Sequence, residues 1–262
     1  MNKQKIETAN YGWYHKNLNI LLLAIGIIGL CLSISSFFLP WFLNIICFIS
    51  GLIINIFFLW PALGLLVINL ISETNKTHPT TCLPEIISLD SPKILDIGCG
   101  TGRVAINMAK NMQNGGHIYG IDIFSEAISN NSLQTVQRNA QIEGVEQKTT
   151  FKFGAATEIP FEDDFFDVVN ISYVMHEIPD KDKVLTEISR VMKQNGTFYL
   201  TEFDRSSLFT ILVNGIYSSI FKKNDYWIKL LKRNGFKAIN YEKLGVVALF
   251  IAKKEGSRIS SA

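Results

Sequence analysis

Residues 94–102 constrain the fold of this chain more than any other part of the sequence. They read Ile-Leu-Asp-Ile-Gly-Cys-Gly-Thr-Gly, an apolar strand with one acid that runs into three alternating glycines. Gly98, Gly100 and Gly102 let the backbone turn sharply and approach a ligand without Cβ atoms in the way. Helix-compatible spacing follows over 104–112, so that the N-terminal amides of that helix would face the same ligand. The pattern predicts a strand, loop and helix that bind a nucleotide-like cofactor.

The N-terminal part of the chain is far more apolar than the rest. Of the 262 residues, 48% are hydrophobic and the mean hydropathy is +0.20, yet residues 18–71 contain no Asp, Glu, Lys or Arg. Two runs, about 18–39 and 42–71, are each long enough to cross a hydrocarbon core of about 30 Å. We therefore predict a membrane hairpin within residues 1–72.

Further residues in this region fit a hairpin. Pro40 and Trp41 form a very short turn between the runs, and Pro61 predicts a kink or the end of the strictly helical part of the second run. Aromatic residues occur near the ends of the first run, as in the interface belts of membrane proteins: Tyr11, Trp13, Tyr14 and Trp41.

Basic residues predict the orientation of the hairpin. The turn carries none, whereas Lys76 follows the second run and three lysines flank the first, namely Lys3, Lys5 and Lys16. The positive-inside rule then places both ends, and the globular part, in the cytoplasm. A cleaved signal peptide is an alternative, but a second long run follows without a small-residue cleavage pattern. Helices that lie partly in the bilayer or form a buried core are the other alternative, and length and absence of charge favour full spans.

The rest of the chain alternates between strand and helix patterns. After a Pro-, Ser- and Thr-rich linker over 73–91, we predict a globular domain over 92–254 and a flexible tail over 255–262. The predicted strands are 93–97, 117–121, 149–153, 166–171 and 196–202, and the predicted helices are 102–112, 125–141, 181–193 and 225–234. Two final apolar runs, 236–242 and 245–252, indicate an antiparallel hairpin. This series predicts an α/β fold with a mostly parallel sheet.

Charge and cysteine content exclude several classes. A net charge of +2 and a pI near 8.3, without clustered Lys and Arg, do not favour a nucleic-acid partner. The cysteines fit neither a disulfide framework nor a metal-ligand spacing, and we predict no metal site: Cys31, Cys47, Cys82 and Cys99.

A second acid narrows the choice of cofactor. Asp122 ends the predicted second strand about 20 residues after the glycine loop, where an acid accepts hydrogen bonds from the ribose hydroxyls of a nucleoside. A dinucleotide loop would need Gly or Ala at 103, which holds Arg103. Asp96 also places a carboxylate beside the loop, which favours a cationic ligand over a pyrophosphate. The pattern favours S-adenosylmethionine.

With these motifs the sequence resembles the class I S-adenosylmethionine-dependent methyltransferases. The motifs that carry the resemblance are 95–102, 120–122, 159–161 with 166–169, and 191–196, in the order of the family. The resemblance covers residues 92–252 and implies a Rossmann-like sandwich around a seven-stranded sheet. Residues 167–203 look most similar to the ubiquinone and menaquinone C-methyltransferases, which as a rule lack a two-span N-terminal hairpin.

The resemblance also implies the cofactor-binding residues. Asp96 and the loop would hold the methionine part, the loop residues being Gly98, Cys99, Gly100, Thr101 and Gly102. Asp122, with Ile123 beside it, would hold the ribose, and Ala155 and Ala156 would flank the adenine. In many relatives the position of Ala155 carries an acid or amide that bonds the adenine amine. Here adenine recognition would depend on main-chain groups and apolar packing.

Two residues are candidates for contact with the methyl acceptor. Asn170 ends the predicted fourth strand, beside the expected methyl group and cofactor, and His176 follows in the next turn. His176 could act as a base, since histidine titrates near neutral pH, or could be a half-buried residue bonded to local backbone. A base is not obligatory, because alignment alone contributes much to methyl transfer.

Other polar residues have weaker functional interpretations. Glu202 and Asp204 end the fifth strand on the same rim but could equally be caps or loop residues. Cys99 lies between glycines without a nearby His, which favours packing over nucleophilic chemistry. His117 is interpreted as structural, and the acids Glu162, Asp163 and Asp164 as a solvated turn.

Residues 207–221 form an apolar segment between the fifth strand and the next helix. The segment is short for a span and ends at Lys222 and Lys223. It could cap an acceptor pocket, lie on the bilayer or form a core helix.

Three functions compete on these observations. We predict a membrane-anchored S-adenosylmethionine-dependent methyltransferase acting on a small apolar or amphipathic acceptor, such as a lipid or quinone. The alternative is a non-catalytic, cofactor-binding membrane scaffold, suggested by Ala155 and the lack of an assured base. A nicotinamide-dependent oxidoreductase is disfavoured by Arg103 and by the lack of a Tyr-x-x-x-Lys pair.

Overall fold

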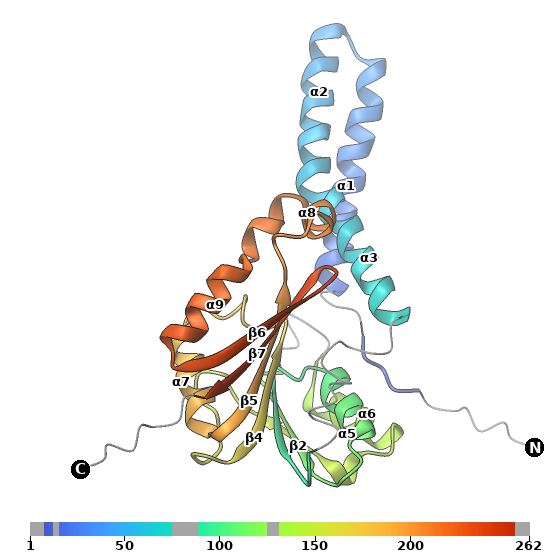
Figure 1. Ribbon diagram of the computed structural model, residues 1–262. Helices are drawn as coiled ribbons and strands as arrows, with labels where there is room; N and C mark the ends of the chain where they lie inside the picture. The colour runs from blue at the N-terminus through green and yellow to red at the C-terminus, as the bar shows by residue number, and fades with distance from the viewer. Residues whose placement is uncertain (1–7, 13–15, 75–88, 125–130, 255–262) are drawn as a thin grey trace, which may run out of the picture. The chain divides into compact units, whose positions relative to one another are not determined.

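A computed structural model describes residues 8–12, 16–74, 89–124 and 131–254 (Figure 1). The chain divides into two compact units. Among the described residues, the α/β unit contains 8–12, 89–124, 131–203 and 223–254, and the helical unit contains 16–74 and 204–222. The sequence-based boundaries at residues 72, 91 and 254 stay predictions.

The α/β unit is built on one seven-stranded sheet in the order β3-β2-β1-β4-β5-β7-β6. Strands β1 to β5 are parallel, and β7 runs antiparallel to both β5 and β6. The strands are β1 (Lys93–Ile97), β2 (His117–Asp122), β3 (Thr149–Phe153), β4 (Phe166–Ser172), β5 (Met192–Phe203), β6 (Phe236–Leu244) and β7 (Val247–Lys254). The predicted Rossmann-like fold with an antiparallel C-terminal hairpin is confirmed.

Helices cover both faces of the sheet (Figure 1). One apolar cluster joins α5 (Arg103–Asn111) and α6 (Leu133–Ile142) to one face, and a second joins α7 (Lys181–Val191) and α9 (Asn224–Arg233) to the other. Successive side chains of β1 point to opposite faces of the sheet, so Ile94 belongs to the first cluster and Leu95 to the second. The result is a three-layer sandwich in which β1 is buried from Ile94 to Ile97.

Most element boundaries lie within two residues of the prediction, and two differ by more. The helix predicted from residue 125 is described only from Leu133, because Ser132 is extended and its side chain accepts the Thr135 amide as an N-cap. Residues 125–130 of that predicted helix lie outside the described residues. The strand predicted from residue 196 begins at Met192, with a register shift against β4 and a positive φ of 64° at Asn195. A bulge thus carries the strand through a stretch that reads as a turn.

The helical unit contains two long apolar helices. Residues Lys16–Phe38 and Trp41–Leu70 have mean hydropathies of 2.5 and 2.4, and by length and composition each could cross a membrane. The elements are α1 (Lys16–Ser35), η1 (Ser36–Phe38), α2 (Trp41–Ile54), η2 (Asn55–Leu59) and α3 (Trp60–Thr74), with α8 (Leu208–Asn214) and η4 (Gly215–Ile220) from later in the chain.

Small residues form the contact between α1 and α2, while large apolar residues face outward. A Cβ on Gly51 would overlap the Ser33 hydroxyl and the Gly29 carbonyl, so the two backbones lie very close. Isoleucines such as Ile27 and Ile45 are more than half exposed, at 56% and 51%. Small residues inside and bulky apolar residues outside are typical of helices packed in lipid.

Pro61 does not end the second helix. The π-helical turn η2 lies immediately before it, and the helix continues to Thr74. Because proline has no amide hydrogen to donate to the preceding turn, a local change of hydrogen-bond pattern accommodates it. Of the two predicted outcomes, the structure thus shows a distorted turn in a continuing helix.

Candidate active site

The glycine loop follows β1 and leads into α5. Gly98 and Gly102 have φ values of 70° and 87°, in the region that favours glycine. A Cβ on Gly98 would overlap the Val174 side chain, so the loop also needs glycine for space. The Gly98 amide donates to the Ile121 carbonyl at 2.8 Å, which ties the loop to β2.

Asp122 at the end of β2 binds the loop directly. Its Oδ2 accepts a hydrogen bond from the Gly100 amide at 2.9 Å, and its Oδ1 accepts one from the Phe124 amide at 2.7 Å. Ile123, next to it, is 53% exposed. Each carboxylate oxygen can accept more than one hydrogen bond. Asp122 can therefore fix the loop and still accept from a ribose.

Asp96 and Asn170 meet at the centre of the sheet. They are register partners on β1 and β4, and Asn170 Nδ2 donates to Asp96 Oδ1 at 2.7 Å. Both side chains are buried, and Asp96 Oδ2 has no hydrogen-bond partner among the described residues. The pKa of Asp96 is raised to about 7 overall: burial is the largest cause and the charge of Asp122 adds to it, whereas the hydrogen bond from Asn170 and one from the Ala105 backbone lower the pKa. A buried acid with an unused oxygen is suited to a cationic ligand.

His176 pairs with Glu202 at the ends of β4 and β5. The ring Nδ1 lies 2.8 Å from Glu202 Oε2, and the His176 amide donates to Oε1 at 3.1 Å. Glu202 is only 1% exposed. Burial lowers the pKa of His176, but the hydrogen bond and charge of Glu202 outweigh it, so the pKa is raised overall. The sequence suggested both residues separately but not their pairing.

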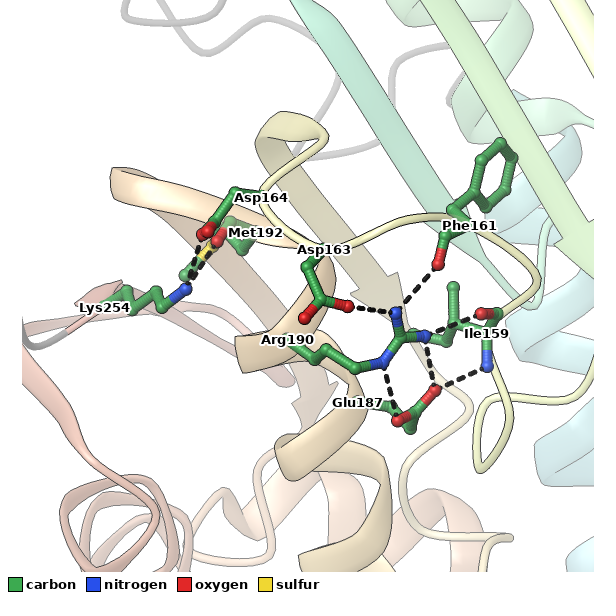
Figure 2. A network of polar contacts seen from close by, with 8 residues as sticks. All are labelled: Ile159, Phe161, Asp163, Asp164, Glu187, Arg190, Met192 and Lys254. Carbon is green, nitrogen blue, oxygen red and sulfur yellow. Dashed lines mark hydrogen bonds and ion pairs between the residues drawn. The ribbon is translucent and has the colours of Figure 1, made fainter.

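A network around Arg190 fixes the loop that carries Ala155 and Ala156 (Figure 2). Arg190 donates to the carbonyl oxygens of Ile159 and Phe161, each at 2.8 Å, and to the carboxylates of Glu187 and Asp163. Glu187 in turn accepts from the buried Ile159 amide at 2.9 Å. Ala155 and Glu158 form an isolated bridge within the same loop. The loop expected to flank the adenine is thus held from α7.

The N-terminal residues bind the glycine loop, which sequence reasoning missed. Asn139 Nδ2 donates to the carbonyl oxygens of both Asn10 and Thr101 at 2.9 Å, and its Oδ1 accepts from the Asn10 amide. The Thr101 hydroxyl donates to the Tyr11 carbonyl oxygen at 3.0 Å. No local pattern reveals these contacts, because they join residues far apart in the chain.

Tyr11, one of the residues predicted for a membrane interface belt, belongs to the α/β unit and contacts its helices. Its hydroxyl donates to Glu143 Oε1 at 3.3 Å, and its ring lies beside the Arg103 guanidinium. Burial, reinforced by Glu143, raises the pKa of Tyr11 above its usual range. Trp13 and Tyr14 lie outside the described residues.

The other polar or nucleophilic residues singled out in the sequence are buried or contact neighbouring protein groups. Burial raises the pKa of the Cys99 thiol, which disfavours the nucleophilic thiolate. His117 faces the Thr150 hydroxyl at 2.8 Å. Asp164 pairs with Lys254 at 2.9 Å (Figure 2), and Asp204 Oδ1 accepts from the Ser206 amide. No cluster of three metal-ligating side chains occurs in the described part of the chain.

The strand order, the loop and the two acids define a Rossmann-like domain for a nucleoside cofactor. A family model described as "Methyltransferase domain" matches residues 89–244, more than half of the chain. The chain belongs to this methyltransferase family, in which S-adenosylmethionine is the cofactor. The Asp96 oxygen that has no hydrogen-bond partner in the described ranges fits its cationic methionine part, and Asp122 fits its ribose.

Two similar proteins bear the names of quinone methyltransferases. The ubiquinone/menaquinone biosynthesis C-methyltransferase UbiE of Vibrio parahaemolyticus is 34% identical over 117 residues, 44% of this chain and 43% of that protein. The demethylmenaquinone methyltransferase of Lactiplantibacillus plantarum is 32% identical over 135 residues, 51% of this chain and 55% of that protein. The chain thus spans about half the length of these relatives.

Among solved structures, a SAM-dependent methyltransferase from Aquifex aeolicus shares the fold. It superposes with a TM-score of 0.58 and 18% identity, covering 69% of this chain and 92% of that one. At this identity the likeness establishes the fold alone.

Proposed function

We propose that this protein is a membrane-anchored methyltransferase that methylates a small apolar or amphipathic acceptor of the lipid or quinone class. The observation that carries the proposal is the Asp96–Asn170 pair beside the glycine loop, with one buried carboxylate oxygen unpartnered within the described residues. Family membership supports the reaction type, and the names of the two quinone methyltransferases support the acceptor class.

The residues that would hold the cofactor come from the ends of β1, β2 and β4. S-adenosylmethionine supplies a methyl group on a positively charged sulfur, which a nucleophile can accept. Asp96 offers a carboxylate oxygen to its cationic methionine part, and Asn170 orients that carboxylate by donating to its other oxygen. Asp122 offers acceptors to the ribose hydroxyls. Because Ala155 and Ala156 have no polar side-chain atoms, main-chain groups and apolar packing would bind the adenine.

The His176–Glu202 pair would remove a proton from the acceptor. When Nδ1–H donates to the buried Glu202 carboxylate, the neutral ring presents a lone pair at Nε2. Nε2 is 3.9 Å from Glu177 Oε1, a carboxylate that is half exposed. Glu202 stabilises the imidazolium that forms, so His176 acts as the general base and Glu202 sets its strength.

The helical unit would anchor the enzyme in a membrane. Its two long apolar helices expose their large side chains, and the lysines at their ends predict a cytoplasmic active site. An anchored site meets a bilayer-resident acceptor at high effective concentration. The proposed organisation is a hairpin in 1–72, a linker over 73–91, the methyltransferase domain over 92–254 and a tail over 255–262.

Isotope transfer tests this proposal. The full chain in nanodiscs is incubated with S-adenosylmethionine labelled on the methyl group and a total membrane lipid extract. We expect label in the organic phase together with release of S-adenosylhomocysteine, both strongly reduced in Asp96→Asn at a cofactor concentration near the Kd of the unmodified protein. Label confined to water-soluble products would contradict the acceptor class, and cofactor binding without turnover on any extract would favour the non-catalytic scaffold.

A further inference from the structure

The uncharged segment 206–221 belongs to the helical unit, although it follows strand β5 in the chain. Within the helical unit, α8 packs on α3. Trp60 Nε1 donates to the Leu212 carbonyl oxygen at 2.5 Å, and a Cβ on Gly64 would overlap the Val213 carbonyl oxygen. Such close backbone contact at a glycine is typical of helix packing in membranes.

The burial pattern of α8 and η4 is the reverse of that of a water-soluble segment. Thr210 and Ser218 are buried, at 1% and 8% exposure, and Val213 lies with them. Most of the outward residues are large and apolar, with exposed fractions of 69% for Leu208, 45% for Phe209, 41% for Ile211, 54% for Leu212 and 51% for Ile220, and Tyr217 and Ser219 are exposed beside them. A segment that exposes large apolar side chains and buries polar ones is more stable in contact with lipid than with water.

We propose that residues 208–220 are a third lipid-facing element, seated in the interfacial region of one leaflet beside α3. This rests on the membrane anchoring proposed above. The segment is too short to cross a bilayer, which favours a position along the interface. Its outward face continues the exposed apolar surface of α3, where Leu63 is 47% and Val67 39% exposed.

The positive charge that follows residues 208–220 is complementary to a bilayer surface with anionic lipids. Lys222 and Lys223 follow η4 after Phe221 and are exposed, as expected for cations that lie at the level of anionic head groups. The chain reaches α8 from the end of β5 through residues 204–207 alone, and β5 carries Glu202.

Lipid-depth quenching of a site-specific fluorophore tests this inference. Single cysteines labelled with an environment-sensitive dye replace Leu208 or Leu212 in the full chain, in a background without the native cysteines. Ile45→Cys in α2 is the reference for the hairpin, and Lys229→Cys, exposed on α9, is the aqueous control. The chain is reconstituted in phosphatidylcholine–phosphatidylglycerol vesicles that contain doxyl-labelled phospholipid.

We expect the labels at 208 and 212 to be quenched several-fold more strongly by the lipid quencher than the label at 229, and to resist aqueous iodide. If the label at 45 is quenched while those at 208 and 212 behave like that at 229, the segment is not in the interface although the hairpin is anchored. If the label at 45 is not quenched either, the anchoring itself is wrong and this inference falls with it.

Discussion

Asn170 donates a hydrogen bond of 2.7 Å to one carboxylate oxygen of Asp96, and the other oxygen of Asp96 has no partner among the described residues. The arrangement orients a buried acid without neutralising it. Burial away from water disfavours the ionised form of an unpaired carboxylate. A bound cation would offset this desolvation free energy by pairing with the carboxylate. This relationship carries the assignment of the cofactor site.

Replacement of Asp96 should separate cofactor binding from stability. We expect Asp96→Asn to lower the affinity for S-adenosylmethionine by about 10- to 100-fold, the effect of losing a charged hydrogen bond. The free energy of unfolding should not fall, because a buried acid whose ionised form is poorly solvated is removed. Calorimetry and thermal unfolding measure the two quantities, with Asp225→Asn on the exposed start of α9 as the control. Unchanged affinity in Asp96→Asn would contradict the assignment.

Cofactor affinity should depend on pH through Asp96. Its pKa is raised to about 7, so the unliganded acid is largely protonated at pH 5.5. A cationic ligand needs the ionised form, and binding must then release a proton. We expect affinity to rise by up to about tenfold per pH unit and to level off above about pH 7. Titrations in buffers of different ionisation enthalpy would detect the proton, and Asp96→Asn should show neither effect.

The histidine base predicts a characteristic pH–rate profile. The raised pKa of His176 keeps the ring protonated to higher pH than usual, so turnover should fall on the acid side of that pKa. Glu202→Gln removes the charge that raises the pKa, and the acid limb should move to lower pH. His176→Ala should reduce the rate by about 100-fold with little change in cofactor affinity. An acid limb that stays in place in Glu202→Gln would show that the pair does not act as proposed.

The Arg190 network should stabilise the adenine-flanking loop. Arg190→Ala leaves Glu187, which is 8% exposed, without its main cation, and we expect it to lower the free energy of unfolding by about 2–3 kcal/mol. Cofactor affinity should also fall, since the loop carries Ala155 and Ala156. Arg233→Ala removes an exposed pair with Asp182 and should cost less. Equal losses in both variants would mean that the network adds nothing beyond a surface ion pair.

The N-terminal residues should contribute to cofactor binding through Asn139. This side chain is 2% exposed and bonds both Asn10 and Thr101. We expect Asn139→Ala to destabilise the domain by about 1–3 kcal/mol and to weaken cofactor binding, because the Thr101 carbonyl loses its partner. Gln141→Ala, exposed on the same helix, is the matched control. Proteolysis near residues 8–12 should become faster in Asn139→Ala alone.

Most of the α/β fold follows from local patterns in the sequence. The glycine loop fixes the first βα unit, and the alternation of strands and helices predicts the parallel sheet with its closing hairpin. Ser132 shows the limit of this reasoning. Helix-compatible residues precede it, but its extended backbone and capping side chain start α6 there instead.

The site was predictable in part, because cofactor acids follow strand ends. The pairing of His176 with Glu202 depends on the register of β4 against β5, which no local pattern encodes. The contacts of Asn10 with Asn139 join residues 129 positions apart and depend on tertiary packing. The reversed burial of α8 likewise emerges only when its neighbours are placed.

A structure of the full chain with bound S-adenosylhomocysteine tests the central claim most directly. We expect the amino group of the ligand within about 3 Å of Asp96 Oδ2 and the ribose hydroxyls at Asp122. A nucleoside bound away from these acids, or an Asp96 oxygen still without a partner in the complex, would contradict the assignment.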